Sequence, residues 1–324
     1  MHQFRMKIFF LMILFFGLSE FLCPPSSDAG EQFVAVILTG DLPRYKKAHE
    51  AFVNILHSGG MNEEKVRIYV QTPNPDPMSW ANSVRKAVAV GADLIVTYGA
   101  PATLAAQKES RGVDVLFADV YDPVALGIVK TLSNPDGNMT GASGKTPLIT
   151  LIKAFTEVKP VKAMGVLYSS NDQSSSHQVK ELTHLAAQYG FSLVERDINS
   201  QKNLLDALET LSGKVDSLFV AESAVLNLDL RKIADYSTKT NLPIISQIPG
   251  FSDLGALMTL EIDPAEQGRL VGVYAMQILS GQKPHTLPVR TPKKVDLVIN
   301  LQTAKKMNLT IPFQVLSMAT KVIR

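Results

Sequence analysis

The sequence predicts an α/β fold of two doubly wound, Rossmann-like parallel sheets joined by a multi-strand hinge. The order of elements in residues 33–118 occurs again in residues 163–246. The strands of both copies are nearly continuous runs of Val, Ile, Leu and Phe, which is the pattern of a parallel sheet covered by helices on both faces. With 324 residues, the chain also exceeds the size at which a single hydrophobic core stops growing.

Each copy alternates strands with helices in the same order. The first copy has strands at 33–38, 66–70, 93–96 and 113–117, with a helix on Tyr45, Ala48, Phe52 and Ile55 after the first strand and a helix at 79–90 after the second. The second copy has strands at 163–168, 191–195, 216–220 and 242–245, with a helix on Leu182, Leu185, Ala186 and Tyr189 and another at 204–211. Two such lobes enclose a cleft, so we expect the functional site between them.

The passage between the predicted lobes is marked by turn-forming residues at 133–147. After the second copy, a helix is predicted at 264–279, and we expect it to return to the first lobe. A strand at 295–300 would then cross back. The predicted first lobe is 30–144 with about 247–285, and the second is 145–246 with about 286–324. Such a set of crossings makes a hinge that can close on a ligand.

Residues 1–29 have the features of a cleavable signal peptide. Arg5 and Lys7 precede an apolar stretch at 8–18, and small residues at 27–29 precede the expected cleavage. We therefore expect a periplasmic or otherwise extracytoplasmic protein.

The same segment does not predict a membrane or lipid anchor. A membrane anchor needs about 20 apolar residues, whereas Ser19 and Glu20 interrupt this run. The only cysteine, Cys23, follows Phe21 and Leu22 rather than the small residues of a lipoprotein site, so we expect no lipid anchor. Because Cys23 would leave with the leader, the mature chain would have no disulfide.

Charge and motifs argue against nucleic-acid binding and against catalysis. The chain has 32 basic and 30 acidic residues, a formal charge of +2, and no basic stripe. The segment 137–146 resembles a phosphate-binding loop, but Met139 stands where glycine is needed and Pro147 where the helix must begin. No G-x-G-x-x-G follows a strand, and no motif places a histidine to activate Ser143. We therefore expect a protein that is not an enzyme and has no cofactor.

The histidines lack the spacing of metal ligands. Val53 stands where a zinc-protease motif starting at His49 needs its second histidine. His177 and His184 are seven residues apart, whereas metal-binding pairs on a helix are usually three or four apart. No metal is expected.

Small polar residues follow the predicted strands, at the edge where such sheets bind ligands. They supply hydrogen bonds rather than proton transfer. The candidate ligand-binding residues are Thr39, Gly99, Ala100, Tyr121 and Asp122 from the first lobe, Ser170, Ser174, Ser175, Glu222 and Ser223 from the second, and Ser143 and Gln247 near the hinge.

Two of these segments have alternative roles that the sequence leaves open. Tyr121 offers an aromatic face for a ligand, and Asp122 either accepts hydrogen bonds from an ammonium group or caps the next helix. Serines 174–176 would cap a helix that starts near His177. The free N–H groups of that helix start would also favour a carboxylate ligand.

Several stretches match a known family. Residues 93–96, 121–124, 138–143, 162–168, 178–182, 213–216 and 255–257, with the tail at 298–312, resemble the substrate-binding proteins of ABC transporters, in the family whose better-known members take up aromatic amino acids. The likeness covers nearly all of residues 33–312. It implies a type I periplasmic-binding fold, capture of a small solute between lobes, and delivery to a membrane permease.

Departures from the family pattern fall in the expected pocket. Ala100 replaces a threonine, and Glu222 with Ser223 stands where the family often has Thr-Asp-Asn, so the usual acidic partner of an amino group is displaced. Ile248 and Pro249 replace acidic residues. The positions that match are Asp122, Ser143 and Ser175. Tyr121 fills a position usually held by a small hydroxyl residue, which indicates a pocket of different shape.

We therefore predict an extracytoplasmic solute-binding protein of an ABC importer, acting as a monomer and closing its lobes on a small solute, with an amino acid as a candidate. The alternative is a ligand-sensing receptor of the same fold, coupled to a membrane signalling protein.

Overall fold

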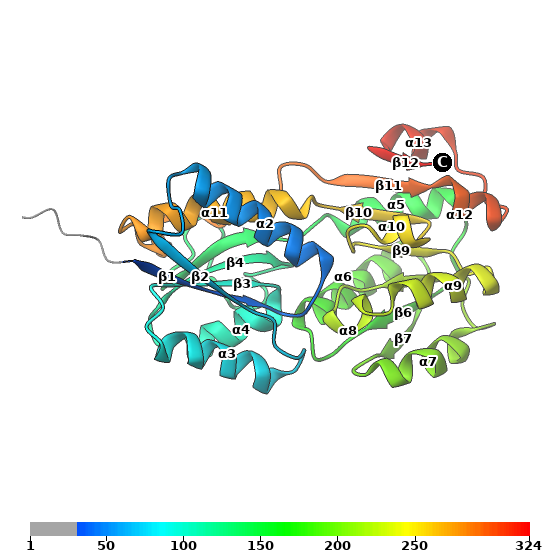
Figure 1. Ribbon diagram of the computed structural model, residues 1–324. Helices are drawn as coiled ribbons and strands as arrows, with labels where there is room; N and C mark the ends of the chain where they lie inside the picture. The colour runs from blue at the N-terminus through cyan, green and yellow to red at the C-terminus, as the bar shows by residue number, and fades with distance from the viewer. Residues whose placement is uncertain (1–30) are drawn as a thin grey trace, which may run out of the picture. The chain divides into compact units, whose positions relative to one another are not determined.

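Two mainly parallel sheets, each covered by helices on both faces, make up residues 31–324, the part of the chain that this computed structural model describes (Figure 1). The predicted signal peptide lies outside the described residues. None of the helices within residues 31–324 is long and apolar enough to cross a membrane. The predicted fold class, two doubly wound α/β lobes, is confirmed.

Lobe 1 is built on a five-stranded sheet. Its elements are β1 (Gln32–Leu38), β2 (Val66–Gln71), β3 (Leu94–Tyr98), β4 (Asp114–Val120) and β5 (Met139–Ser143), with helices α2 (Pro43–Ser58), α3 (Pro77–Ala89), α4 (Ala100–Glu109) and α11 (Pro264–Leu279) and the 3-10 turn η2 (Pro284–Thr286). The strands are all parallel, in the order β2-β1-β3-β4-β5. Val34 and Val36 of β1 pack with α2 and α11, whereas Ala35 and Ile37 pack with α3 and α4 on the other face.

Lobe 2 is built on a seven-stranded sheet. Its strands are β6 (Ala163–Tyr168), β7 (Ser192–Asp197), β8 (Ser217–Val220), β9 (Ile244–Ser246), β10 (Met258–Glu261), β11 (Asp296–Asn300) and β12 (Lys321–Ile323). Its helices are α5 (Leu148–Val158), α6 (Gln173–Tyr189), α7 (Leu204–Leu211), α8 (Ala224–Asn227), α9 (Leu230–Thr240), α10 (Phe251–Leu254), α12 (Leu301–Lys306) and α13 (Phe313–Met318), with the 3-10 turn η1 (Gln201–Asn203). The order is β12-β11-β10-β9-β8-β6-β7, and the pair β10 and β11 is antiparallel.

The sequence repeat reappears in the strand order. The first four strands of lobe 1 lie as β2-β1-β3-β4, and the matching strands of lobe 2 lie as β7-β6-β8-β9. Each sheet then has a fifth parallel strand beside the fourth, β5 in lobe 1 and β10 in lobe 2. The two copies are therefore built in the same way.

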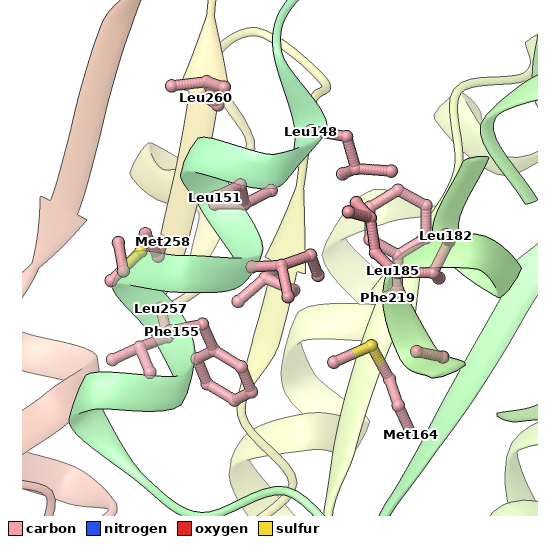
Figure 2. Packing of buried hydrophobic residues seen from close by; sticks show 14 of the residues in the cluster. Leu148, Leu151, Phe155, Met164, Leu182, Leu185, Phe219, Leu257, Met258 and Leu260 are labelled. Atoms are coloured by element: carbon pink, nitrogen blue, oxygen red, sulfur yellow. The ribbon is translucent and has the colours of Figure 1, made fainter. Parts of the chain in front are cut away.

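The lobes exchange one covering helix. Helix α5 follows β5 of lobe 1 but packs on the sheet of lobe 2, where Leu151 and Phe155 lie with Met164 and Met258 in one buried cluster (Figure 2). Helix α11 follows β10 of lobe 2 but packs against α2 in lobe 1. These two exchanges, and the return of the chain to β11, make the crossings between the lobes.

The second crossing differs from the prediction. We expected lobe 1 to resume at about residue 247, but β10 pairs with β9 and β11, so the chain stays with lobe 2 up to Glu261. Only α11 and the segment that follows it, including Arg290 beside β5, return to lobe 1. The physical reason is that β10 takes the place beside β9 in the lobe 2 sheet that β5 takes beside β4 in the lobe 1 sheet.

Helices α2 and α11 touch at their main chains. A Cβ atom added at Gly268 would overlap the carbonyl oxygen of Ala48, and one added at Gly272 would lie 2.8 Å from the Cβ atom of Ile55. Glycine at these positions is therefore what allows the close approach.

Candidate functional site

Side chains that follow the strands of lobe 1 meet side chains that follow the strands of lobe 2. The most buried of these contacts is made by Arg44, at the start of α2 just after β1. Its Nε atom lies 3.0 Å from Asp119 Oδ2 in lobe 1, its Nη1 atom contacts Glu222 Oε1 in lobe 2, and its Nη2 atom donates to the Tyr45 hydroxyl at 3.0 Å. A positive charge is disfavoured at a helix N-terminus, so helix stability does not explain an arginine here.

Asp119 reaches Arg44 because β4 is irregular at this point. The pairing of β4 with β5 shifts register between Phe117 and Val120, and Asp119 has a φ of 56°. A bulge of this kind turns a side chain away from the regular alternation of a strand. Its main-chain N–H donates to Gln267 Oε1 of α11 at 3.0 Å, which holds the irregular backbone in place.

Glu222 is held from behind by α6. It follows β8, is 6% exposed, and its main-chain N–H donates to Gln178 Oε1 at 2.7 Å. The main chain of Glu222 is thus fixed by a helix of its own lobe, and its carboxyl group contacts the guanidinium of Arg44.

A third carboxyl, that of Asp172, lies at the start of α6. Its Oδ1 atom accepts from the Ser174 N–H at 3.0 Å, so Asp172 caps this helix. We expected serines 174–176 to cap a helix starting near His177, but α6 begins at Gln173. Asp172 is buried, and its charge acts on both Arg44 and Glu222. We call Arg44, Asp119, Asp172 and Glu222 the interlobe carboxyl cluster.

The charges of the interlobe carboxyl cluster do not balance. Burial raises the pKa of Asp119 and of Glu222 even though Arg44 acts against it. Burial raises the pKa of Asp172 to about 6. Burial alone would lower the pKa of Arg44, but Glu222 and Asp119 outweigh it and the pKa is raised, so the guanidinium stays charged. One guanidinium thus faces three carboxyl groups that hold protons more tightly than usual, so bound protons offset part of their charge near neutral pH.

The buried Asp172 should make stability fall with rising pH. The pKa of its carboxyl is about 6 in the folded protein against a usual 3.8, so the folded state holds this proton more tightly than the unfolded state. Its contribution to the free energy of unfolding is complete below pH 3.8 and is lost as pH rises to about 6, by about 3 kcal/mol in all. Asp172→Asn keeps a capping side chain and should remove this component, as urea unfolding from pH 4 to 7 would measure.

Asp76 provides a matched control for this prediction. It also caps a helix that has a serine in its first turn, but it is partly exposed, and its hydrogen bonds from Ser79 lower its pKa. Asp76→Asn should therefore change stability with the opposite sign, the loss in the wild type appearing as pH falls. A stability profile unaltered by Asp172→Asn would contradict the assigned burial.

Several buried polar atoms beside the interlobe carboxyl cluster have no hydrogen-bond partner among residues 31–324. Within the cluster, Arg44 Nε, Arg44 Nη1 and Glu222 Oε1 make ion-pair contacts but no hydrogen bonds. Beside it, the atoms without a partner belong to four further side chains: Tyr98 Oη, Ser174 Oγ, Gln178 Nε2 and Gln247 Oε1. All four side chains are at least nine-tenths buried. Because buried polar atoms are nearly always bonded, these atoms mark places where a small polar ligand can bond.

A second, more exposed group of contacts joins the lobes beside this cluster. The Tyr121 hydroxyl donates to Glu181 Oε2 of α6 at 2.9 Å. Lys145, on the first crossing, lies 2.6 Å from Asp122 Oδ2 and 3.7 Å from Glu181 Oε2. Asp122 also accepts from the Ala125 N–H at 3.0 Å. The capping role that the sequence allowed for Asp122 is thus present, together with an ion pair.

The other predicted site residues lie at the same strand ends but mostly bond within one lobe. Thr39 Oγ1 accepts from the Ala102 N–H, Ser175 Oγ from the Ser169 N–H, and Ser223 Oγ from the Leu226 N–H. Ser143 Oγ donates to main-chain carbonyl oxygens of lobe 1, and Ser170 bonds with Asp197. Gly99 begins α4 with a φ of 89°, and Ala100 is packed in the core of lobe 1.

The predicted set therefore contributes Glu222 and Tyr121 to the contacts between the lobes. Gln247 bonds to Thr146 on the first crossing, and Ser174 supplies a buried hydroxyl without a partner. The predicted set omits Arg44, Asp119, Asp172, Gln178 and Glu181. Asp172 follows β6 by a few residues and could have been found by extending the strand-end rule, whereas Asp119 lies within β4, where the pairing is irregular. Arg44 has no such signal.

Known proteins share both the sequence pattern and this fold. A sequence model of the ABC transporter substrate binding protein family matches residues 33–323. The chain belongs to this family. A tyrosine-binding protein from Clostridioides difficile (strain R20291) is 26% identical over 269 residues, which cover 82% of this chain and 78% of that protein. None of these names refers to a signalling receptor, so nothing favours the alternative function.

Two solved structures of relatives differ in how closely they match. The ABC domain in complex with L-Trp from Streptococcus pneumonia has a TM-score of 0.86 and 26% identity, covering 90% of this chain and 100% of that one. The ligand-free, open structure of a substrate-binding protein with adhesive properties from Clostridium difficile has a TM-score of 0.67 and 25% identity, covering 90% and 99%.

Proposed function

We propose that this protein captures a small ammonium compound of the amino-acid kind between its lobes and delivers it to a membrane permease. Membership of the substrate-binding family supports solute capture and work with an ABC permease. The tyrosine-binding relative and the tryptophan complex support a solute of the amino-acid class.

The interlobe carboxyl cluster is the single observation that carries this proposal. Asp119, Asp172 and Glu222 place carboxyl groups around one guanidinium, in a setting where Arg44 is 7% exposed. Electrostatic attraction is strong where water is excluded, so a bound ammonium group would favour the ionised carboxylates and take the place of the protons that burial makes them hold. Closing the lobes brings Glu222 to Arg44 and would enclose the solute.

We further propose that the protein binds its solute outside the cytoplasm and does not catalyse a reaction. Ser143, the one serine that a hydrolase motif could have used, donates to the carbonyl oxygens of Val120 and Tyr121, and within residues 31–324 no histidine bonds to it. The signal peptide predicted at 1–29 supports export.

The test is to identify the solute that the protein retains. The full-length protein is expressed in its exported form, purified without denaturant, unfolded, and the released small molecules are weighed by mass spectrometry. We expect a compound with a primary amine, and we expect the same compound to raise the melting temperature of the emptied, refolded protein.

The specificity of that result is checked with neutral solutes and variants. A panel of neutral sugars should not raise the melting temperature. Glu222→Gln should weaken binding of the amine, whereas Asp235→Asn, at an exposed position of α9, should leave it unchanged. Release of a nucleotide or a sugar, with no response to any amino acid or amine, would overturn the proposed function.

A further inference from the structure

The groups that ordinarily bind a carboxylate ligand already face the protein's own carboxyl groups. The N-terminus of α6 lies at the interlobe carboxyl cluster, because Asp172 is its N-cap residue, and a helix N-terminus normally attracts anions. Here the Ser174 N–H donates to Asp172 Oδ1 at 3.0 Å. A ligand carboxylate at this position would have to displace a buried carboxylate of the same charge.

Arg44 is engaged in the same way. Its Nε and Nη1 atoms face Asp119 and Glu222, and its Nη2 atom bonds with Tyr45. A guanidinium is the strongest carboxylate partner that a protein offers. The charge of this one is already paired with Asp119 and Glu222, although Nε and Nη1 make no hydrogen bond to them. No second arginine or lysine contacts Asp119, Asp172 or Glu222 within residues 31–324.

The remaining free groups suit a neutral polar atom. Gln178 Nε2 and Ser174 Oγ are buried without partners, and neither carries a charge. Gln178 lies directly against Glu222, because its Oε1 atom accepts from the Glu222 N–H. A carbonyl oxygen of an amide can bond there, whereas an ionised carboxylate would meet three carboxyl groups in a buried setting.

We infer that this site selects ligands with a net positive charge and no free carboxylate, such as amino-acid amides and amines, over the corresponding free amino acids. This inference rests on the proposed function and narrows its ligand class. A metal ion fits less well, because no three acidic, histidine or cysteine side chains within the described part of the chain are arranged as metal ligands, and Arg44 already stands among the carboxyls.

The experiment compares ligands that differ only in the carboxyl group. The full-length protein is emptied of ligand by unfolding and refolding. Calorimetry then measures the affinities for L-tryptophan, L-tryptophanamide and tryptamine, followed by those for L-tyrosine and L-tyrosinamide. The measurements are made at about pH 7, where an α-amino group is mostly charged. Aliphatic and polar amino acids are tested in the same pairs. For each side chain that binds, we expect the amide to bind at least about tenfold more tightly than the acid.

The outcomes separate this inference from the proposed function. A free amino acid that binds as tightly as its amide, or more tightly, overturns the inference and leaves the proposed function standing. No binding by any acid, amide or amine overturns the proposed function.

A pair of variants tests whether the cluster causes the preference. Glu222→Gln should reduce the ratio of amide to acid affinity several-fold, because it removes one carboxyl from the interlobe carboxyl cluster. Asp235→Asn should leave the ratio unchanged. An unchanged ratio in a folded Glu222→Gln protein, as judged by its circular dichroism, would contradict the role given to Glu222.

Discussion

Replacing Arg44 by methionine is expected to lower the free energy of unfolding at pH 7 by about 3–5 kcal/mol, the cost of leaving buried charges without a partner. Arg44 is the one cation in contact with both Asp119 and Glu222 among the described residues. The methionine side chain fills much of the same space but cannot bond to either carboxyl. Urea unfolding monitored by circular dichroism measures the loss.

The neighbouring Lys46 supplies the control. It lies in the same helix and pairs with Asp41, but the two side chains are 58% and 62% exposed. Exposed pairs contribute about 0–1 kcal/mol, so Lys46→Met should change stability little. Adding Glu222→Met to Arg44→Met should recover part of the loss. Equal effects of Arg44→Met and Lys46→Met would show that Arg44 is not held as described.

Replacing Gly268 by alanine is expected to cost about 3 kcal/mol, at the upper end of the range for overpacked cores. The added Cβ atom would overlap the carbonyl oxygen of Ala48 in α2, and main chain cannot rotate away as a side chain can. Alanine favours a helix by about 1 kcal/mol over glycine, which offsets only part of the clash.

Gln277→Ala tests the same helix away from this contact. Gln277 is exposed near the end of α11, and surface changes of this kind alter stability by about 0.5 kcal/mol or less. The urea midpoints of the two variants are compared with that of the wild type. A Gly268→Ala protein as stable as Gln277→Ala would mean that α2 and α11 do not touch at this point.

The parts of the fold that could be predicted are those coded by local sequence. Runs such as Val34 to Leu38 are apolar throughout because both faces of the sheet are covered, and the structure buries them accordingly. The helix predicted at 264–279 matches α11, because Pro264 suits the first turn of a helix and Gly281 follows its end. The duplication then supplied the order of the strands.

The place of β10 could not be predicted in this way. Met258 and Leu260 are apolar residues that could pack in either sheet, and the local sequence does not specify which strand β10 pairs with. The choice is made by tertiary pairing with β9 and β11. Only the comparison with β5 at the same place in lobe 1 accounts for it.

The candidate site likewise contains residues that local sequence predicts and residues that depend on tertiary contacts. Glu222 and Gln247 were identified because they directly follow strands, and the structure places Glu222 against Arg44 of lobe 1 and Gln247 against Thr146 on the first crossing. Arg44 stands in a run with Lys46 and Lys47 that has the polarity of a solvent-facing turn of helix. Its burial depends on tertiary contacts with Asp119 of lobe 1 and Glu222 of lobe 2. The orientation of the Asp119 side chain depends on a bulge, and no residue pattern in β4 predicts that bulge.

The reciprocal exchange of α5 and α11 means that neither half of this molecule is self-sufficient. A fragment ending anywhere before Pro264 would leave Tyr45 and Phe52 of α2 without their covering partners Val271 and Tyr274. The N-terminal half can therefore complete its core only after synthesis has passed through the other half and reached Leu279. Such interlocking makes the folding contacts long in sequence, and it ties the two halves into one melting unit that no single proteolytic cut could separate into two stable pieces.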